Sequence, residues 1–198
     1  MATVVVPFRD SDPKRRLARV SESDRGRLAE AMLADVLDAA GPVGPVLVVS
    51  ARRPALPPGV EHVDDPRHGQ GAAVRAALDA AVARALPAPY LVANADLPCA
   101  TTRDLLALAG AVPDGGLAYV AAADGTTNAL GLADARLFEP VYGPGSAERF
   151  AGLAPSLRLD APNLIDDVDT VEDLERLQDR LGPQTRRVLA ELRVGAAA

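Results

Sequence analysis

Aspartates stand at two places in the chain where their spacing could bind a divalent cation. Asp96 follows an apolar run that reads as a buried strand, within Asn94-Ala95-Asp96-Leu97-Pro98. Asp167 and Asp169 are separated by one residue, so in extended chain both carboxylates point to one side while Val168 points to the other. Mg²⁺ binds few carboxylates together with phosphate oxygens and water, which is the chemistry of an enzyme acting on a nucleoside triphosphate.

Each of these acidic positions also has a simpler explanation. Asp96 could cap the helix that follows it, although Thr101 with Asp104 forms a better capping pair a few residues later. Asp167 and Asp169 precede a helix that begins near Thr170, where negative charge is favourable without any metal. The spacing alone favours a metal ligand at position 96 and leaves the role of the pair open between metal binding and helix stabilisation.

A cationic segment follows the first expected strand. Of the chain's 21 basic residues, 20 are arginines and Lys14 is the single lysine. A cation-rich loop at a strand end could hold a triphosphate and stabilise the charge that develops on departing pyrophosphate. The alternative is an ordinary solvated loop, but its position after the strand favours the phosphate-binding interpretation. The cations of this segment are Arg9, Lys14, Arg15, Arg16 and Arg19, set against Asp10 and Asp12.

Three stretches that contain or adjoin a glycine offer backbone amides and polar side chains. Gly143-Pro144-Gly145-Ser146 leads into a short helix and could bind a carboxylate or a phosphate, or could be only a turn and an N-cap. Thr126-Thr127-Asn128 offers hydroxyls and an amide beside a glycine turn, with the same ambiguity. Gly69-Gln70-Gly71 is the weakest nucleotide signal of the three, because glycines before a helix often serve packing.

Strands and helices that alternate along the chain must position these residues. The pattern favours a single-domain α/β fold, a doubly wound and mostly parallel sheet with helices on both faces, whose ligands lie at the carboxyl ends of the strands. We assign residues 1–194 to this domain and 195–198 to a disordered tail. The expected strands are 3–8, 46–50, 59–64, 89–95, 117–122 and 129–132. The expected helices are one over about 22–40, one opened by Gly69-Gln70-Gly71 and running to about Leu86, one from Thr101, one from Thr170 carrying Val171, Leu174, Leu177 and Leu181, and one after Pro183.

Composition narrows the possible partners. The 198 residues are 48% apolar, yet no apolar run approaches the roughly 20 residues that cross a bilayer, so no membrane partner is expected. A net charge of −6 argues against nucleic acid as the main partner. Cys99 is the only cysteine, which excludes an intramolecular disulfide, and we expect it to be a small buried residue in a cytoplasmic protein. A monomer and a homodimer both remain open.

Six short motifs, taken in order, resemble those of the 2-phospho-L-lactate/phosphoenolpyruvate guanylyltransferases. Members of this family make a guanylylated intermediate in the biosynthesis of the deazaflavin coenzyme F-420, and their fold is that of nucleotide-diphospho-sugar transferases. The resemblance covers about residues 4 to 178. The motifs are Val6-Pro7-Phe8-Arg9, Pro13-Lys14-Arg15-Arg16-Leu17, Asn94-Ala95-Asp96-Leu97-Pro98, Asp124-Gly125-Thr126-Thr127-Asn128-Ala129-Leu130, Tyr142-Gly143-Pro144-Gly145-Ser146 and Asp167-Val168-Asp169-Thr170-Val171-Glu172-Asp173-Leu174.

The resemblance implies a role for each motif. Magnesium would be held by Asp96, Asp167 and Asp169, and the carboxylate of the phosphorylated acid by Thr127, Gly143 and Ser146. Lys14 and Arg16 would contact the phosphates of GTP and act in catalysis with Asp96, while Arg9 and Gly71 would complete the nucleotide site. The chain departs from the family at three places. The family's lysine after the first strand is Arg9, and its Gly-Leu-Asn is Gly71-Ala72-Ala73. Its Gly-Gly-Thr-Asn is Gly125-Thr126-Thr127-Asn128, so either Thr126 or Thr127 could be the threonine that binds the acceptor.

The function implied by the resemblance is transfer of GMP from GTP to the phosphate of phosphoenolpyruvate or 2-phospho-L-lactate, with release of pyrophosphate. The partners are then GTP and a small phosphorylated carboxylic acid. One alternative is a nucleotidyltransferase of the same fold that uses another acceptor, such as a sugar phosphate or a molybdopterin-like compound. Another is a nucleotide-binding protein without catalytic activity, in which Ala72 and Ala73 mark a degenerated site.

Overall fold

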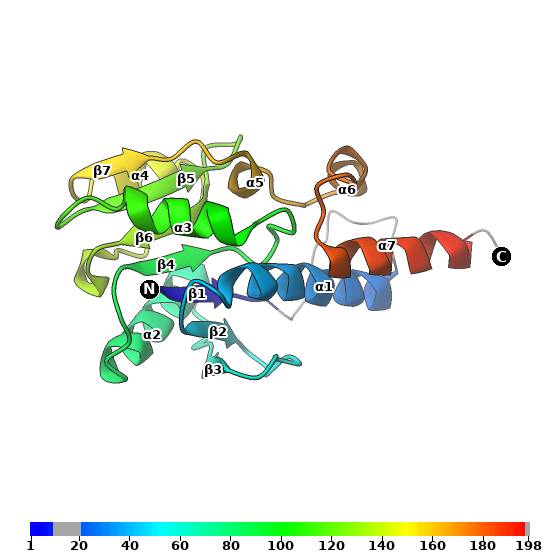
Figure 1. Cartoon of the computed structure of the whole chain (residues 1–198), viewed down its shortest axis with the longest axis horizontal. Helices are drawn as coiled ribbons and strands as arrows, with labels where there is room; N and C mark the ends of the chain where they lie inside the picture. Colours follow the sequence, from blue (N-terminus) through cyan, green and yellow to red (C-terminus); the bar gives the residue numbers. More distant parts are fainter. Residues whose placement is uncertain (10–20, 197–198) are drawn as a thin grey trace.

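A computed structural model describes residues 1–9 and 21–196 of the chain, which form a sheet covered by helices (Figure 1). The strands are β1 (Thr3–Pro7), β2 (Val46–Ser50), β3 (Val60–Asp64), β4 (Tyr90–Ala93), β5 (Leu117–Ala121), β6 (Thr127–Leu132) and β7 (Ser156–Arg158). The helices are α1 (Glu22–Ala40), α2 (Gln70–Ala83), α3 (Thr102–Ala111), α4 (Ser146–Ala151), α5 (Pro162–Ile165), α6 (Val171–Arg176) and α7 (Pro183–Ala196), with a 3₁₀ turn η1 (Ala135–Leu137).

Among the described residues the sheet has seven strands, in the order β3-β2-β1-β4-β6-β5-β7. Neighbouring strands from β3 to β4 run parallel, and β5 pairs in parallel with β7. Strand β6 runs antiparallel to both β4 and β5, so its first residue lies beside the end of β4. The prediction of a mostly parallel sheet is confirmed, and β6 is the exception.

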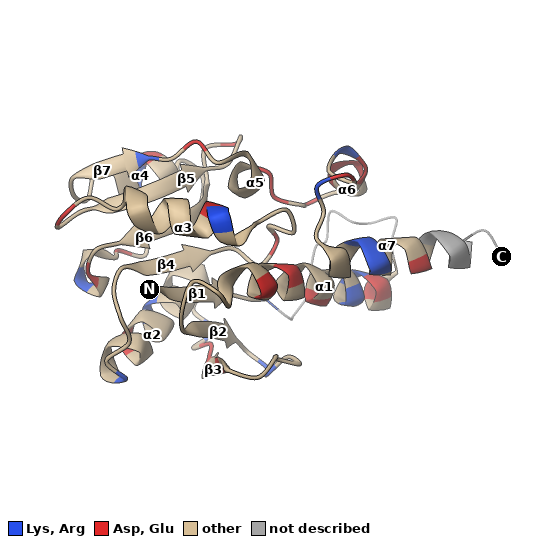
Figure 2. Ribbon diagram, viewed as in Figure 1, with Lys and Arg blue, Asp and Glu red and all other residues tan. Residues whose placement is uncertain are grey.

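Helices cover both faces of the sheet, because the central strands are apolar on both sides. Val4 and Val6 of β1 face a core shared with Val36 of α1 and Leu105 of α3. The side chain between them, Val5, faces a second core together with residues of α2, η1 and α4. A continuous apolar run is the expected pattern for a parallel strand that is buried on both faces. Figure 2 shows the complementary pattern, with charged residues prominent on the helices and the strands largely free of them.

The pair formed by α1 and α7 extends away from the sheet (Figure 1). Leu28 and Met32 of α1 share a third core with Leu181, just before α7, and with Val188 of α7. The buried carboxylate of Asp35 accepts hydrogen bonds from the backbone N–H groups of Gln184 and Thr185, each at 2.9 Å. A carboxylate in α1 therefore satisfies two of the N–H groups at the start of α7, where a helix has no partners of its own.

Several details differ from the expected elements. The turn η1, the short strand β7 and the helix α5 are additional to them, and helix α6 ends at Arg176 although the apolar pattern continues to Leu181. The chain after Arg176 continues in turns, with Leu181 N–H donating to the Leu177 carbonyl at 3.1 Å, so the periodic leucines still reach the core. Helix α7 continues through 195 and 196, two residues expected to belong to the tail. Within the described part of the chain, no helix is long and apolar enough to cross a membrane.

Candidate active site

Three carboxylates come together at one edge of the sheet. Asp96 lies just beyond the end of β4, while Asp167 and Asp169 lie in the link between α5 and α6. Each residue offers one carboxylate oxygen, and these oxygens all lie within 4.8 Å of one another. All three residues are half-buried. The structure thus unites two acidic motifs that are about 70 positions apart in the sequence.

The backbone fixes this approach. The N–H of Val168 donates to the carbonyl of Asp96 at 3.0 Å, which joins the two segments directly. The side chain of Val168 is fully buried, with 0% exposure, in the core formed with Leu28 and Met32 of α1. In extended chain the neighbours of an inward side chain point the opposite way. Burial of Val168 therefore turns its two aspartate neighbours toward the side on which Asp96 lies.

The helix cap of α6 is supplied by other residues. The side chain of Thr170 accepts from the backbone of Asp173, and Asp173 accepts in return from the backbone N–H of Thr170 at 2.9 Å. The same carboxylate accepts from the N–H of Asp169 at 3.2 Å. Because this capping box serves the start of α6, the two aspartates of the pair are not required as caps. The geometry favours their use as ligands.

A preceding acid anchors the same segment to α6 and its continuation. Asp166 is paired with Arg176 at 2.7 Å and also with Arg180. Burial raises the pKa of the Asp166 carboxyl, but hydrogen bonds from Arg180 and Arg176 outweigh that effect, so its pKa lies below the ordinary value. Asp166 is thus an ionised anchor for the acidic link rather than a fourth member of the carboxylate cluster.

Asn128 contacts the cluster and Asn94 lies beside it. Residue spacing assigns no role to Asn94 and offers Asn128 only as a possible binding amide. Asn128 donates from Nδ2 to the Ile165 carbonyl at 2.9 Å and lies 3.5 Å from Oδ1 of Asp167. Asn94 donates to the Thr127 carbonyl at 3.3 Å and accepts from Gln70 Nε2 at 2.8 Å. The one signal in the sequence is that both asparagines lie within motifs at strand ends, a position where amides often tie neighbouring segments together.

The hydroxyls of Thr127 and Ser146 form a second polar group. Their oxygens lie 3.1 Å apart, and the residues are 3% and 0% exposed. The Gly143 carbonyl accepts from the N–H of Ser146 at 2.9 Å, so this glycine lies at the same place. Thr126 instead donates its hydroxyl to Asp124 at 2.6 Å. Of the two threonines that the sequence leaves as alternatives, Thr127 is therefore the one placed with Gly143 and Ser146.

The expected nucleotide-binding residues are only partly described. Arg9 is exposed directly after β1, at the edge where the strand ends. Gly71 lies in the first turn of α2, where an added Cβ would come 2.5 Å from Cβ of Pro140, so its lack of a side chain permits close packing. Lys14 and Arg16 lie outside the described residues.

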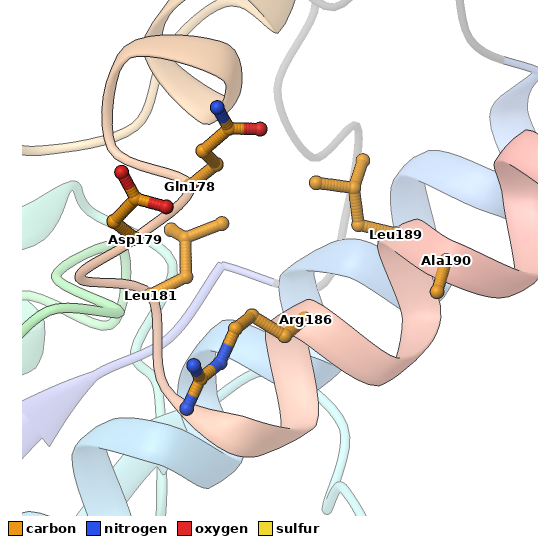
Figure 3. A pocket seen from close by; sticks show the side chains of 6 residues that line it. All are labelled: Gln178, Asp179, Leu181, Arg186, Leu189 and Ala190. Atoms are coloured by element: carbon orange, nitrogen blue, oxygen red, sulfur yellow. The ribbon is translucent and has the colours of Figure 1, made fainter.

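Two hollows of the described surface lie away from the carboxylate cluster. One of about 490 Å³ is formed by the turns after α6 and by one side of α7, as Figure 3 shows with Leu181, Arg186 and Leu189. Another of about 370 Å³ lies between α1, α7 and residues 54–57. Neither of these two hollows is lined by an aspartate of the cluster. The predicted burial of Cys99 is confirmed, and burial raises the pKa of its thiol, which keeps it protonated near neutral pH.

Comparison with known proteins gives a consistent family. Residues 25–157 match the model of the MobA-like NTP transferase domain. The phosphoenolpyruvate guanylyltransferase of Nocardia farcinica is 33% identical over 205 residues, covering 96% of this chain and 91% of that protein. The 3-phospho-D-glycerate guanylyltransferase of Phenylobacterium zucineum is 34% identical, covering 91% of each chain. These matches confirm the resemblance carried by the six sequence motifs.

A solved structure supports the fold independently. A Desulfovibrio desulfuricans protein described as a nucleotide-diphospho-sugar transferase superposes with a TM-score of 0.76, covering 96% of this chain and 95% of its own. Its sequence identity is 18%, so the likeness concerns the fold. The predicted architecture of a nucleotide-diphospho-sugar transferase is confirmed.

Proposed function

Because this chain belongs to the family of MobA-like NTP transferases, and within it to the guanylyltransferases, we propose that it transfers GMP from GTP to a small phosphorylated carboxylic acid. Phosphoenolpyruvate is the acceptor we expect first, with 2-phospho-L-lactate and 3-phospho-D-glycerate as alternatives. The product is a guanosine diphosphate ester of the acid, which fits a step in coenzyme F-420 biosynthesis. The observation that carries the proposal is the convergence of Asp96, Asp167 and Asp169 in a chain with these relatives.

The carboxylate cluster suits a magnesium ion. Three half-buried carboxylates with oxygens within 4.8 Å of one another present hard oxygen ligands, which Mg²⁺ prefers, and their like charges favour a cation between them. We assign the metal to Asp96, Asp167 and Asp169. When bound, the ion would neutralise charge on the phosphates of GTP and on the departing pyrophosphate. The residues that hold this segment in place are Val168, Asp166 and Asp173.

The polar residues around the Thr127 and Ser146 hydroxyls are proposed to bind the acceptor. Thr127, Gly143 and Ser146 offer hydroxyls and a backbone amide that suit a carboxylate, since these donors match its oxygens. Thr127 and Ser146 are buried and hydrogen-bonded to each other, so one hydroxyl hydrogen lies between them and at most one hydroxyl can donate to a bound carboxylate. The acceptor phosphate would then extend from this anchor toward the aspartates.

Cations from the segment after β1 are proposed to hold the triphosphate. Arg9, Lys14 and Arg16 are cations in a chain whose net charge is −6, and Gly71 lets the start of α2 pack closely. The proposal for Lys14 and Arg16 rests on the sequence motif and the family. Replacing Lys14 by Ala should raise the KM for GTP and leave the KM for the acceptor nearly unchanged.

The reaction needs positioning more than proton transfer. An oxygen of the acceptor phosphate attacks the α-phosphorus of GTP in line, a new P–O bond forms, and the bond to the β-phosphate bridging oxygen breaks to release pyrophosphate. The second pKa of a phosphate monoester is about 6, so at neutral pH most of it carries two negative charges. No general base is therefore required, and the protein contributes alignment and charge neutralisation.

The test is direct. Purified protein is incubated with GTP, Mg²⁺ and each of the three acids, and both pyrophosphate and the guanylylated product are measured by an enzyme-coupled assay and by mass spectrometry. We expect turnover with GTP and one preferred acid, and much less with ATP. If folded protein releases no pyrophosphate with any of the three acids, the proposed function is wrong. Turnover with a sugar phosphate instead would assign the chain to the same fold with another acceptor.

A further inference from the structure

Arg149 of α4 holds the loop that carries Gly143. Its Nε and one terminal nitrogen donate to the Val141 carbonyl at 3.0 and 2.8 Å, and that terminal nitrogen also lies 3.3 Å from the Tyr142 carbonyl. The other terminal nitrogen donates to the Pro144 carbonyl at 2.7 Å. A single guanidinium thus binds three carbonyls of one short loop, although Arg149 itself is an exposed residue.

These hydrogen bonds determine the direction in which the N–H groups of the loop point. In a trans peptide the carbonyl of one residue and the N–H of the next point in opposite directions. Carbonyls of Val141, Tyr142 and Pro144 that face the guanidinium therefore turn the N–H groups of the following residues away from it. Two of those amides belong to Gly143 and Gly145, whose positive φ angles of 107° and 72° are compatible with this fold of the loop.

The loop and the hydroxyl pair form one unit. Ser146 begins α4 directly after the loop, and its N–H donates to the Gly143 carbonyl at 2.9 Å. Arg149 lies one turn further along the same helix. Its side chain therefore folds back over the residues that precede its own helix and sets the position of Gly143 relative to Ser146 and Thr127.

We propose that Arg149 is a positioning residue for the acceptor, which shapes the loop 141–145 so that its amides present to the carboxylate of the phosphorylated acid. The inference rests on the proposed function and adds a residue outside the group that contacts the substrate. The geometry assigns Arg149 to the acceptor side alone, because the hydrogen bonds of its guanidinium within the described residues all go to carbonyls of this loop.

The guanidinium shape is the property that matters. Arginine offers five N–H donors in a rigid planar fork, whereas lysine offers a compact ammonium on a flexible stem. One ammonium cannot span three carbonyls arranged as these are. If Arg149 acted only by placing positive charge near the acceptor, Arg149→Lys would restore activity. If it acts by holding the loop, Arg149→Lys and Arg149→Ala should have similar defects.

The experiment measures steady-state kinetics of wild type, Arg149→Ala and Arg149→Lys, varying GTP and phosphoenolpyruvate in turn. We expect the KM for phosphoenolpyruvate to rise by roughly 10- to 100-fold in both variants, the loss typical of hydrogen bonds to a charged group, with the KM for GTP within about twofold of wild type. Arg136→Ala is the matched control, because Arg136 is also exposed but binds only Asp134 in the described structure. That control should match wild type in both constants.

The outcomes separate the inference from the function on which it rests. Wild-type protein that uses no acid acceptor would overturn the proposed function. An active wild type with an unchanged phosphoenolpyruvate KM in Arg149→Ala would overturn the role of Arg149 alone. Near-wild-type kinetics in Arg149→Lys would also overturn it, in favour of a simple charge effect. Equal increases in both KM values with a lowered melting temperature would show a general loss of structure and reject the acceptor-side role.

Discussion

The backbone N–H of Val168 donates to the carbonyl of Asp96 at 3.0 Å, so the two acidic segments of the site are joined by their main chains. This backbone bond brings the two segments together without requiring any contact between their carboxylates. Like charges held within 4.8 Å repel, and the hydrogen bond together with the burial of Val168 offsets that repulsion. Side-chain substitutions at the three aspartates should therefore change the chemistry without dismantling the site.

Asp96→Asn should abolish catalysis while the fold persists. An amide keeps the size of the side chain but replaces a charged oxygen ligand, and metal charge stabilisation of several kcal/mol corresponds to roughly 1,000-fold in rate. The rate of pyrophosphate release is the measurement. Asp114→Asn, at an exposed turn, is the control and should turn over at the wild-type rate. Activity near wild type in Asp96→Asn would remove Asp96 from the metal site.

Removing divalent cations should stop turnover and lower thermal stability in the presence of GTP. A ligand at about 100 times its Kd stabilises the folded state by roughly 2.7 kcal/mol, which is about 5 to 10 °C for a domain of this size. Thermal unfolding with GTP and Mg²⁺, compared with GTP and EDTA, measures the difference. Asp96→Asn is expected to show little of this shift. A wild type with equal melting temperatures in both conditions would argue against a metal-dependent nucleotide complex.

The hydroxyl pair of Thr127 and Ser146 should show strong coupling. Replacing either partner leaves the other buried hydroxyl without this contact, so Thr127→Val or Ser146→Ala should each lower the free energy of unfolding by about 1 to 3 kcal/mol. The double variant should lose clearly less than the sum of the two, because no orphaned hydroxyl remains. Urea denaturation of the four proteins gives the coupling energy. Simple additivity would mean that the pair makes no specific bond.

Gly182→Ala should destabilise the protein. An added Cβ would come 2.2 Å from Cγ of Asp35, the carboxylate that accepts from the first N–H groups of α7. A misfit of this kind lowers the free energy of unfolding by about 1 to 3 kcal/mol. Gly110→Ala is the opposite control, since nothing lies within 4 Å of its added Cβ and alanine favours the helix by roughly 1 kcal/mol. Denaturation of both variants should give changes of opposite sign.

Much of the fold follows from local patterns. The parallel half of the sheet is specified by apolar runs on β1, β2 and β4, and helix α1 has the bounds predicted from a capping pair at Ser21 and a Gly-Pro stop. Asp96 could be assigned to the ligand-binding edge of the sheet, because parallel strands bring their carboxyl ends together. Asp167 and Asp169 lie between two helices, and only the family resemblance joined them to Asp96. Asp96 is therefore recognisable as a candidate ligand from its position directly after a buried strand.

The features that local patterns do not predict depend on contacts distant in sequence. Nothing local in β6 shows that it runs antiparallel, yet that direction brings Thr127, at the start of a strand, beside the end of β4. Nothing in the sequence distinguishes Arg149 from other helical arginines. Its hydrogen bonds to three carbonyls exist only because the loop folds against it. Pairings of this kind are set by tertiary packing, which residue spacing does not encode.

The capping of α7 by Asp35 has a consequence for how the protein is made. Asp35 lies in the first 40 residues, and the N–H groups that donate to its carboxylate belong to residues about 150 positions later. At roughly 5 to 20 residues per second, a ribosome needs on the order of 10 to 30 s to add that stretch. During this interval Leu28 and Met32 have no α7 to cover them, so the nascent chain exposes an apolar stripe on α1. Helix α1 is therefore the segment on which we would look first for a chaperone bound during synthesis.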